Sequence, residues 1–527
     1  MKKRGQFPDS YTYTILLRGL SINAHTSGVL QKALSIYHSL FAANSRVEPS
    51  IIHTNAALRV CARAMDMDAL WGIAAKIPET GPGAANVTTY HTIINAIRHN
   101  MLLNVPRDES EEEAAARKER GIMEARRLWE DIAGKWRNAD LHIDEELVCS
   151  MGRLLLLGAR PRDWDDVLSL IEQTMNIPRL VPRLGTAERK EAGFSQLRAP
   201  NVPEGYRFDD DHLAPGQPSV RGDEFLPFSG SVVKHLGFVK PDNNTLSILQ
   251  EACQKIAAPK AADQYWNMLV DPAGFNVTPD MNNLNQRLRN MRQNRASAAA
   301  VKLLQEDMIY KGLPPRPGTF RIAMSTCVRD KNNHNSLKHA SQILRAMDQT
   351  LEDADAKAVG MYADLAIAFP LAKGQDLIDA LTHLHPFVKS LRLQLGVGGV
   401  DRKPRDRRQT YLVGQERQDA LATLRKVYGV YDRLLLSNLI PEEQKQDFKK
   451  ERARLGAFIL RENERSNGRK TGDLNNEHGQ PRLEGEADMH GYLNDEPTQD
   501  NTHERRTWRA HDSTESRGNR RTRNANP

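Results

Sequence analysis

The chain has 527 residues, and its 74 Lys and Arg exceed its 67 Asp and Glu, giving a formal net charge of +7 and a pI near 9.1. Charged residues make up 27% and hydrophobic residues 39%, so a core can form over much of the chain but not over all of it. No apolar run approaches the roughly 20 residues of a membrane-spanning helix. These values exclude a membrane-spanning protein. The mild excess of positive charge favours binding to a polyanion only if the cationic side chains gather on one face of the protein.

Cysteine and histidine spacing argues against a metal centre. The four cysteines form no Cys-x-x-Cys pair and have no histidine at finger-like spacing. His383 and His385 lack a third ligand at suitable spacing. We therefore expect no metal, no cofactor and reduced thiols, with Cys61, Cys253 and Cys327 as small buried hydrophobes.

Seven segments share one layout, in which a proline or a polar residue precedes an apolar stretch of helical character. Proline ends the helix before it, and a following Asp, Ser or Thr can accept hydrogen bonds from the free amides of the next helix. Each segment therefore predicts a helix start. They begin at Pro8, Pro49, Asn86, Asp144, Pro241, Pro279 and Arg316.

A second helical pattern follows most of these starts. A small residue is followed by a large one four positions on and another three or four beyond, as in Ala125, Trp129 and Ile132 or Ala262, Trp266 and Leu269. These spacings place all three on one helical face, so both tryptophans are expected in the core. Matching positions recur after 36, 38 and 36 residues, with longer steps of 41 and 58. An all-α solenoid of stacked helix pairs is predicted.

Composition divides the chain further. Residues 104–120 hold a charged run that we expect to be a solvated extension, and the next segment is rich in Pro, Gly, Asp and Arg and should split the array. The C-terminal residues 463–527 include few apolar residues, which is typical of a disordered tail. The predicted parts are repeats over 8–177, a long loop or partly disordered insertion over 178–239, repeats over 240–350, capping helices over 351–462 and a disordered tail over 463–527.

The N-terminal residues resemble the end of an earlier unit. Met1–Gln6 is basic but too short for an amphipathic organellar presequence. Pro8 and Asp9 look like the closing residues of a repeat, so we expect further sequence, including a presequence, upstream of this chain.

The units resemble pentatricopeptide repeats. Residues 88–96, Thr-Thr-Tyr-His-Thr-Ile-Ile-Asn-Ala, are similar to the opening of that repeat, and residues 300–308 with Gly312–Pro315 are similar to its ending. Tetratricopeptide repeats have a shorter period of about 34 and a Trp-Leu-Gly-Tyr pattern that is missing from this sequence. The resemblance covers a little over half of the chain and implies a fold that binds single-stranded RNA.

The resemblance also implies which residues read the RNA. In the family, the fifth residue of the first helix and the last residue of the repeat together read one base edge, which requires an unpaired base. The pairs carried over to this chain are Thr14 with Ser50, Asn55 with Asn86, His91 with Asp144, Ser247 with Asp280, and Asn285 with Arg316.

Two of these pairs resemble known combinations. Asn55 with Asn86 is similar to pyrimidine-reading pairs, and Ser247 with Asp280 is similar to a guanine-reading pair. His91 and Arg316 depart from the usual choices, as do the fifth residues Cys149 and Arg321, so no base is assigned to them.

Among fungal mitochondrial members of the family, the resemblance is to factors in small-subunit ribosomal RNA processing and maturation. It therefore implies a mitochondrial protein whose partners are ribosomal or messenger RNA and the small ribosomal subunit. Messenger RNA stability or translation, and a scaffold role in the mitochondrial ribosome, remain alternatives. An enzyme is not expected, because the C-terminal region lacks clustered Asp residues for two metals and the His-x-Glu and Cys-x-x-Cys signature of a zinc deaminase.

Overall fold

A computed structural model describes residues 7–470, apart from residues 44, 107, 185, 194–224, 226–236, 396–411, 413 and 438. Residues 1–456 form one compact unit, and residues 457–527 are assigned to a second, whose described part is the end of one helix. The described residues form helices and connections, with no strand among them. None of the described helices is long and apolar enough to cross a membrane.

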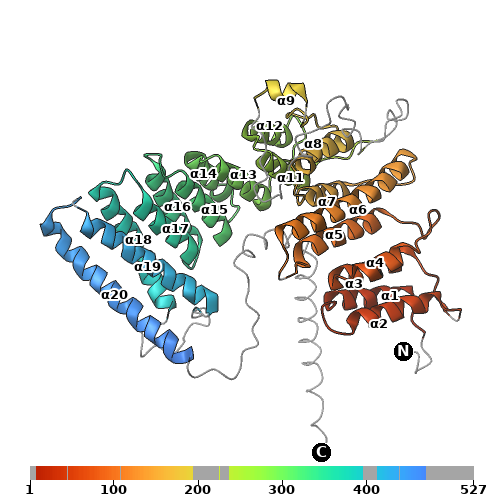
Figure 1. The fold of residues 1–527 in the computed structure, drawn as a ribbon, viewed down its shortest axis with the longest axis horizontal. Coiled ribbons are helices and arrows are strands. Elements are labelled where there is room, and N and C mark those ends of the chain that lie inside the picture. Colours follow the sequence, from red (N-terminus) through yellow and green to blue (C-terminus); the bar gives the residue numbers. More distant parts are fainter. Residues whose placement is uncertain are drawn as a thin grey trace, which may run out of the picture. The chain divides into compact units, whose positions relative to one another are not determined.

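The helices come in consecutive pairs (Figure 1). The first helices of the pairs are α1 (Ser10–Ile22), α3 (Ile51–Ala64), α5 (Val87–Leu103), α7 (Glu145–Leu155), α11 (Asn243–Lys255), α13 (Met281–Gln293), α15 (Pro317–Arg329), α17 (Ala356–Ala368) and α19 (Gly414–Leu436). The second helices are α2 (Val29–His38), α4 (Met67–Ala74), α6 (Glu111–Arg137), α8 (Pro161–Met175), α12 (Pro259–Val270), α14 (Ser297–Lys302) with the π-helical turn η5 (Leu303–Ile309), α16 (Ser336–Thr350) and α18 (Gly374–Gln394). α20 (Glu442–Lys470) follows α19.

Each first helix packs against the first helix of the next pair, from α1 on α3 to α17 on α19. Each second helix packs on its own first helix, so the apolar face of one pair is covered by the next. The start of this stack buries Leu17 and Ala33 of the first pair against Ala56 and Val60 of the second. This arrangement is an α-solenoid, and the predicted all-α fold is confirmed.

The long insertion does not split the array, so that expectation is wrong. α11 lies against both α7 and α8, the helices before the insertion. Glu145 Oε1 accepts hydrogen bonds from the backbone nitrogens of Asp242 and Thr245, both at 2.8 Å. The chain returns to the place it left, since Val239 N donates to Thr174 O at 2.9 Å. The stack therefore runs on past residues 178–239.

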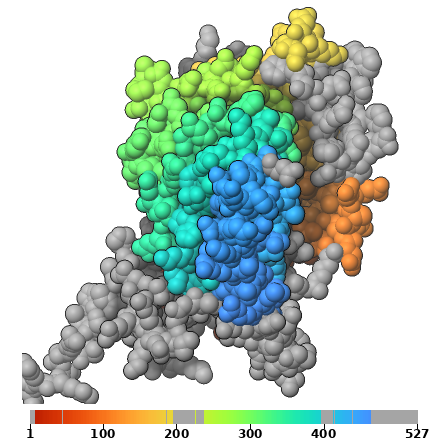
Figure 2. Space-filling model, turned by 90° about the vertical axis from the view of Figure 1, so that its left-hand side faces the viewer, coloured from red at the N-terminus to blue at the C-terminus, as the bar shows by residue number. Residues whose placement is uncertain are grey.

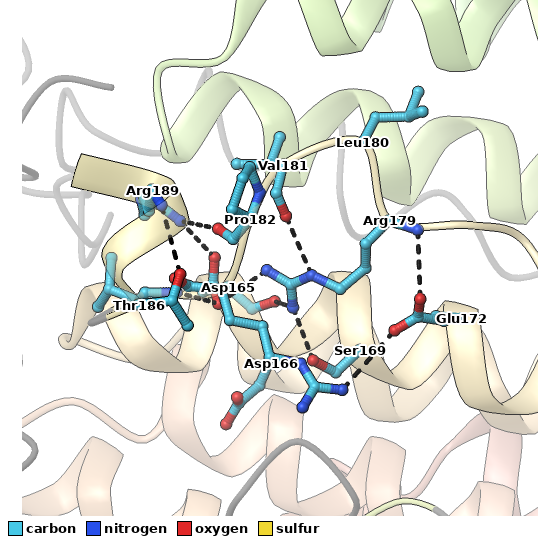
Figure 3. A network of polar contacts seen from close by, with 12 residues as sticks. Asp165, Asp166, Ser169, Glu172, Arg179, Leu180, Val181, Pro182, Thr186 and Arg189 are labelled. Atoms are coloured by element: carbon cyan, nitrogen blue, oxygen red, sulfur yellow. Dashed lines mark hydrogen bonds and ion pairs between the residues drawn. The ribbon is translucent and has the colours of Figure 1, made fainter. Parts of the chain in front are cut away.

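The first part of the insertion is fixed by a buried ion network on α8 (Figure 3). Asp165 pairs with Arg179 NH2 at 3.0 Å through one carboxylate oxygen and with Arg189 NH1 at 2.7 Å through the other. All three side chains are at most 7% exposed. Arg189 belongs to the short helix α9 (Ala187–Glu191), which is therefore tied to α8.

One residue in the middle of the insertion is also anchored. The Phe225 ring packs edge-on against Trp129, with 6.2 Å between centroids. Phe225 N donates to Gln173 Oε1 at 3.1 Å, and Trp129 Nε1 donates to Phe225 O at 3.3 Å. Trp129 and Trp266 are both buried, which confirms their predicted place in the core.

The charged run predicted as an extension is the start of a helix instead. α6 begins at Glu111, and Ser110 caps it while Glu113 Oε2 accepts from Ser110 N at 3.0 Å. Acidic residues stabilise a helix N-terminus, because the free amides and the helix dipole favour negative charge there. Of residues 104–120, therefore, only the segment before Glu111 connects α5 to α6.

The helices predicted as caps continue the stack. α17 packs on α15 and α19 packs on α17, as earlier first helices do. Figure 2 views this end of the stack, where the green-to-cyan surface belongs to α13–α18 and the blue surface belongs to the helices that follow them. α20 runs to Lys470, into the segment expected to be a tail. Residues 396–411 and residues 471–527 lie outside the described residues.

All four cysteines are buried free thiols. Burial raises the pKa of Cys61, Cys149, Cys253 and Cys327 to about 12 in each case, so the thiols stay protonated. The expectation that Cys61, Cys253 and Cys327 are buried hydrophobes is confirmed. Among the described residues, no group of His, Cys, Asp and Glu is placed to hold a metal ion.

Replacing Asp165 by Ala is expected to lower the free energy of unfolding by about 3–5 kcal/mol, because two guanidinium groups would stay buried without their carboxylate. Urea titration followed by circular dichroism measures the change. Asp263→Ala is the matched control, since that carboxylate is 69% exposed and pairs with Arg287 at 3.4 Å. Its loss should cost less than about 1 kcal/mol. Equal losses in the two variants would contradict the proposed anchoring of the insertion.

Candidate nucleic-acid interface

Most first helices have a buried polar residue at their third position, which completes the N-terminal cap in α3, α5, α13 and α15. These residues are His53, Thr89, Thr245, Asn283 and Thr319, each at most 1% exposed. In α5, Thr89 N donates to Asn86 Oδ1, and Asn86 N donates to Thr89 Oγ1, both at 3.1 Å. This reciprocal pair satisfies two amides that a helix start otherwise leaves free. The last residue of each repeat is therefore also the N-cap of the next first helix.

The same cap reaches the preceding first helix. Asn55 Nδ2 donates to Asn86 Oδ1 at 3.1 Å, and Thr89 Oγ1 donates to Asn55 Oδ1 at 2.7 Å. Asn55 is the fifth residue of α3, and Asn86 is the cap of α5. The structure thus brings the predicted pair into direct contact at the solvent-accessible end of the two helices.

Ser247 and Asp280 are joined through a third residue. Asn283 Nδ2 donates to Ser247 Oγ at 2.8 Å, and Asn283 N donates to Asp280 Oδ1 at 2.8 Å. Asn283 also donates to Asn243 O in α11 at 2.8 Å. The predicted pair therefore shares one site, but the contact between its members runs through the buried amide of the cap.

The remaining predicted residues lie at equivalent positions. Thr14 Oγ1 donates to Ser10 O at 3.2 Å, and Ser50 belongs to the cap of α3. Arg316 is exposed and precedes α15. Asn285 Oδ1 is buried and accepts no hydrogen bond within the described part of the chain. None of the ten predicted reader residues is fully buried, and their role in base reading stays a prediction.

His91 lies in a mixed electrostatic environment formed by three first helices. Burial lowers the pKa of His91 below its usual value. Glu146 and Asp144 raise that pKa, whereas Arg153 and Arg59 lower it. These side chains come from α3, α5 and α7, so all three helices contribute to one surface around His91.

Two of the fifth residues cannot read a base as they stand. Cys149 is completely buried, and its Sγ lies 3.8 Å from Thr245 Oγ1. Arg321 forms a two-pronged ion pair with Asp355, with Arg321 Nε at 2.9 and 3.1 Å and NH2 at 2.5 Å from its oxygens. Asp355 also accepts from Ala358 N at 2.8 Å as the cap of α17. In these two repeats the fifth residue contacts other residues of the fold and is not free to contact a ligand.

A set of arginines on this surface was missed by the sequence analysis. Each lies four residues after the fifth residue of its first helix, a spacing that puts both on one helical face. Arg18 and Arg59 are exposed, and Arg153 and Arg289 are half-buried. The recurrence of arginine at this fixed offset was the signal that could have revealed them.

Comparison with known proteins gives low similarity throughout. No family model and no curated protein matches the chain. The crystal structure of the pentatricopeptide repeat protein PPR10 from maize is similar, with 13% sequence identity over 88% of this chain and 76% of that chain and a TM-score of 0.27. The crystal structure of PPR10 in complex with an 18-nucleotide psaJ RNA element has 13% sequence identity over 86% of this chain and 71% of that chain, with a TM-score of 0.19. With TM-scores this low, the interpretation of the chain rests on its own helix pairs.

Replacing Thr89 by Val is expected to lower the free energy of unfolding by about 1–3 kcal/mol, because the lost hydroxyl leaves polar groups of the cap and of Asn55 without partners. Chemical denaturation measures the loss. Thr88→Val is the control at the neighbouring exposed position and should change stability by less than about 0.5 kcal/mol. A neutral Thr89→Val variant would refute the role of the cap between successive first helices.

Proposed function

We propose that the chain binds single-stranded RNA along the surface formed by the fifth residues of the first helices and the caps that follow them. The contact between Asn55 and Asn86 carries the proposal, because it joins the two predicted readers of one repeat at 3.1 Å. Small amide and hydroxyl groups can meet the pairing edge of a base only where that base is unpaired. The ligand is therefore a single strand.

The Asn55 and Asn86 pair has donors left for a ligand. Thr89 occupies Asn55 Oδ1, and one proton of Asn55 Nδ2 is given to Asn86. A side-chain amide carries two N–H donors, so one remains on Asn55 and two remain on Asn86. Such a pair suits the carbonyl oxygens of a pyrimidine, in agreement with the combination that the sequence resembles.

The arginines beside the readers supply the contribution to affinity that is independent of sequence. Arg18 and Arg59 are exposed, and each lies one helical turn after the predicted reader of its helix, Thr14 or Asn55. Guanidinium groups so placed can contact phosphates while the fifth residues contact bases. Binding should then weaken steeply with salt, because phosphate contacts release counterions.

For the biological setting we propose mitochondrial RNA, with small-subunit ribosomal RNA processing or maturation as the leading role. The resemblance to fungal mitochondrial pentatricopeptide proteins supports this proposal. Messenger RNA stability or translation, or a scaffold role in the mitochondrial small ribosomal subunit, are the alternatives. Tagging the protein for localisation, followed by crosslinking and sequencing of bound RNA, distinguishes them. A binder is favoured over an enzyme because the described surface offers base- and phosphate-contacting groups in a repeating pattern.

Substituting Asn55 and Ser247 together by Ala should weaken binding to the crosslinked RNA by about tenfold or more, since base-edge contacts are worth roughly 1–3 kcal/mol each. Fluorescence anisotropy measures affinity, and circular dichroism should show unchanged helicity. The control replaces Gln31 and Asn267 by Ala, which are exposed residues of the second helices α2 and α12. Unchanged affinity of the Asn55/Ser247 variant would argue against base reading at these positions.

Replacing Arg18 and Arg59 by Gln should weaken binding to different RNA sequences by a similar factor. The slope of log K against log salt concentration should fall by about one to two, as expected for the loss of two contacts to single-stranded phosphates. A series of titrations from low to moderate salt measures the slope. An unchanged slope would show that these two arginines do not contact phosphate.

A further inference from the structure

A pocket of about 380 Å³ lies between the C-terminal ends of three consecutive first helices, α13, α15 and α17. Gln293 is the last residue of α13, and Arg329 is the last residue of α15. Arg295 and Lys331 lie just beyond these helix ends, and Asp364 comes from α17. The pocket is outside every predicted reader position.

The pocket lies along the same helices that carry predicted fifth-residue readers. Gln293 and Arg329 lie eight residues after the fifth residues Asn285 and Arg321, and Asp364 lies four residues after Gly360. In an α-helix these offsets return to the same face, one or two turns along. A strand that follows the fifth residues therefore passes within reach of the pocket.

Positive charge at the pocket is uncompensated. Arg295, Arg329 and Lys331 are exposed, and their side chains make no hydrogen bond or ion pair within the described part of the chain. The one lining acid, Asp364, is paired with Lys426 Nζ of α19 at 2.6 Å. Three cations therefore face a space whose only carboxylate is already neutralised.

The free backbone carbonyls at the C-terminal end of α17 are bonded by a cation. Helix C-termini carry free carbonyls that disfavour anions. At the end of α17, Arg433 donates to Ala366 O and Ile367 O at 2.7 and 2.6 Å and to Phe369 O at 2.7 Å. This guanidinium offsets the negative end of the helix that forms one wall.

The acid nearest in sequence to the pocket cations is also engaged elsewhere. Asp330 Oδ2 accepts from Ser297 Oγ at 2.5 Å and from Asn333 Nδ2 at 2.9 Å. Its carboxylate is thus held on the side of α14 and the turn after α15. Asp330 is not among the residues that line the pocket.

Base reading ends where the pocket begins. Arg321 is held by Asp355, and the equivalent fifth residue of α17 is Gly360, which has no side chain and is buried. Of the three helices that form the pocket, only α13 therefore has a free polar fifth residue, Asn285. At α15 and α17 the pocket offers cations but no free reader, which suits a phosphate group and no base.

We propose that this pocket binds the terminal phosphate of a single-stranded RNA. A phosphomonoester carries a charge of about −1.5 to −2 near neutral pH, whereas an internal phosphodiester carries a single charge. Three unpaired cations match the terminal group better. The proposal rests on the proposed RNA binding, and it adds that the bound strand has a phosphorylated end at the C-terminal side of the free readers.

The test compares one crosslinked RNA sequence carrying a 5′-phosphate, a 3′-phosphate or hydroxyls at both ends. The wild-type protein should bind one phosphorylated form about tenfold more tightly than the hydroxyl form, as one added charge-assisted contact implies. The 5′ and 3′ forms identify which end occupies the pocket. Replacing Arg329 and Lys331 by Gln should abolish this preference while leaving affinity for the hydroxyl form unchanged, which also shows that the variant is folded.

A matched control removes two charges elsewhere. Lys302→Gln with Lys311→Gln affects exposed residues that pair with Glu306 and Asp307 on the second helix, and it should keep the preference. Equal wild-type binding of all three RNAs would overturn the pocket proposal and leave RNA binding intact. A preference that survives in the Arg329/Lys331 variant, or a uniform loss for all three RNAs, would likewise overturn it. Failure of every RNA to bind would instead overturn the proposed function.

Discussion

The rest of the structure depends on the hydrogen bonds made by the buried polar residue at the third position of the first helices. This residue completes the cap of its own helix in α3, α5, α13 and α15, and in α5 and α13 it bonds the fifth residue of the helix before it. A polar group buried between helices must be paired, so only one register between successive pairs satisfies it. Apolar packing alone tolerates sliding of one helix on another, whereas these hydrogen bonds fix which residues meet at the surface.

This local rule explains how the stack accommodates a long insertion. α11 is capped by Glu145 of α7, so the contact between the two first helices replaces the usual cap from the preceding residue. Asp165 and Phe225 then fasten parts of the insertion to α8 and α6. In a solenoid each pair needs only its neighbours, and an insertion that leaves and returns at one place preserves them.

The same geometry divides the surface into regions of different chemistry. At α5, where the third residue is the hydroxyl-bearing Thr89, Asn55 and the cap residue Asn86 share hydrogen bonds and keep donors for a ligand. Where the cap is Asp355 and the fifth residue is Arg321, the pair satisfies itself. Beside that pair, the exposed cations Arg295, Arg329 and Lys331 line the pocket between α13, α15 and α17. In the proposed mode, Arg18 and Arg59 contact phosphates beside the first readers, and this pocket adds a further phosphate site.

The sequence by itself determined the helix starts and the repeat period, because capping residues and apolar spacing act within one or two helical turns. The ten candidate readers came from the family resemblance and stay a prediction. The sequence also placed Trp129, Cys61, Cys253 and Cys327 in the core. It could not show that Cys149 is buried, that Arg321 is held by Asp355, or that α11 returns to α7 across the insertion. Those outcomes depend on residues 34 to 97 positions apart in the chain, and only the packing of one helix pair on the next decides whether a polar side chain is left for a ligand.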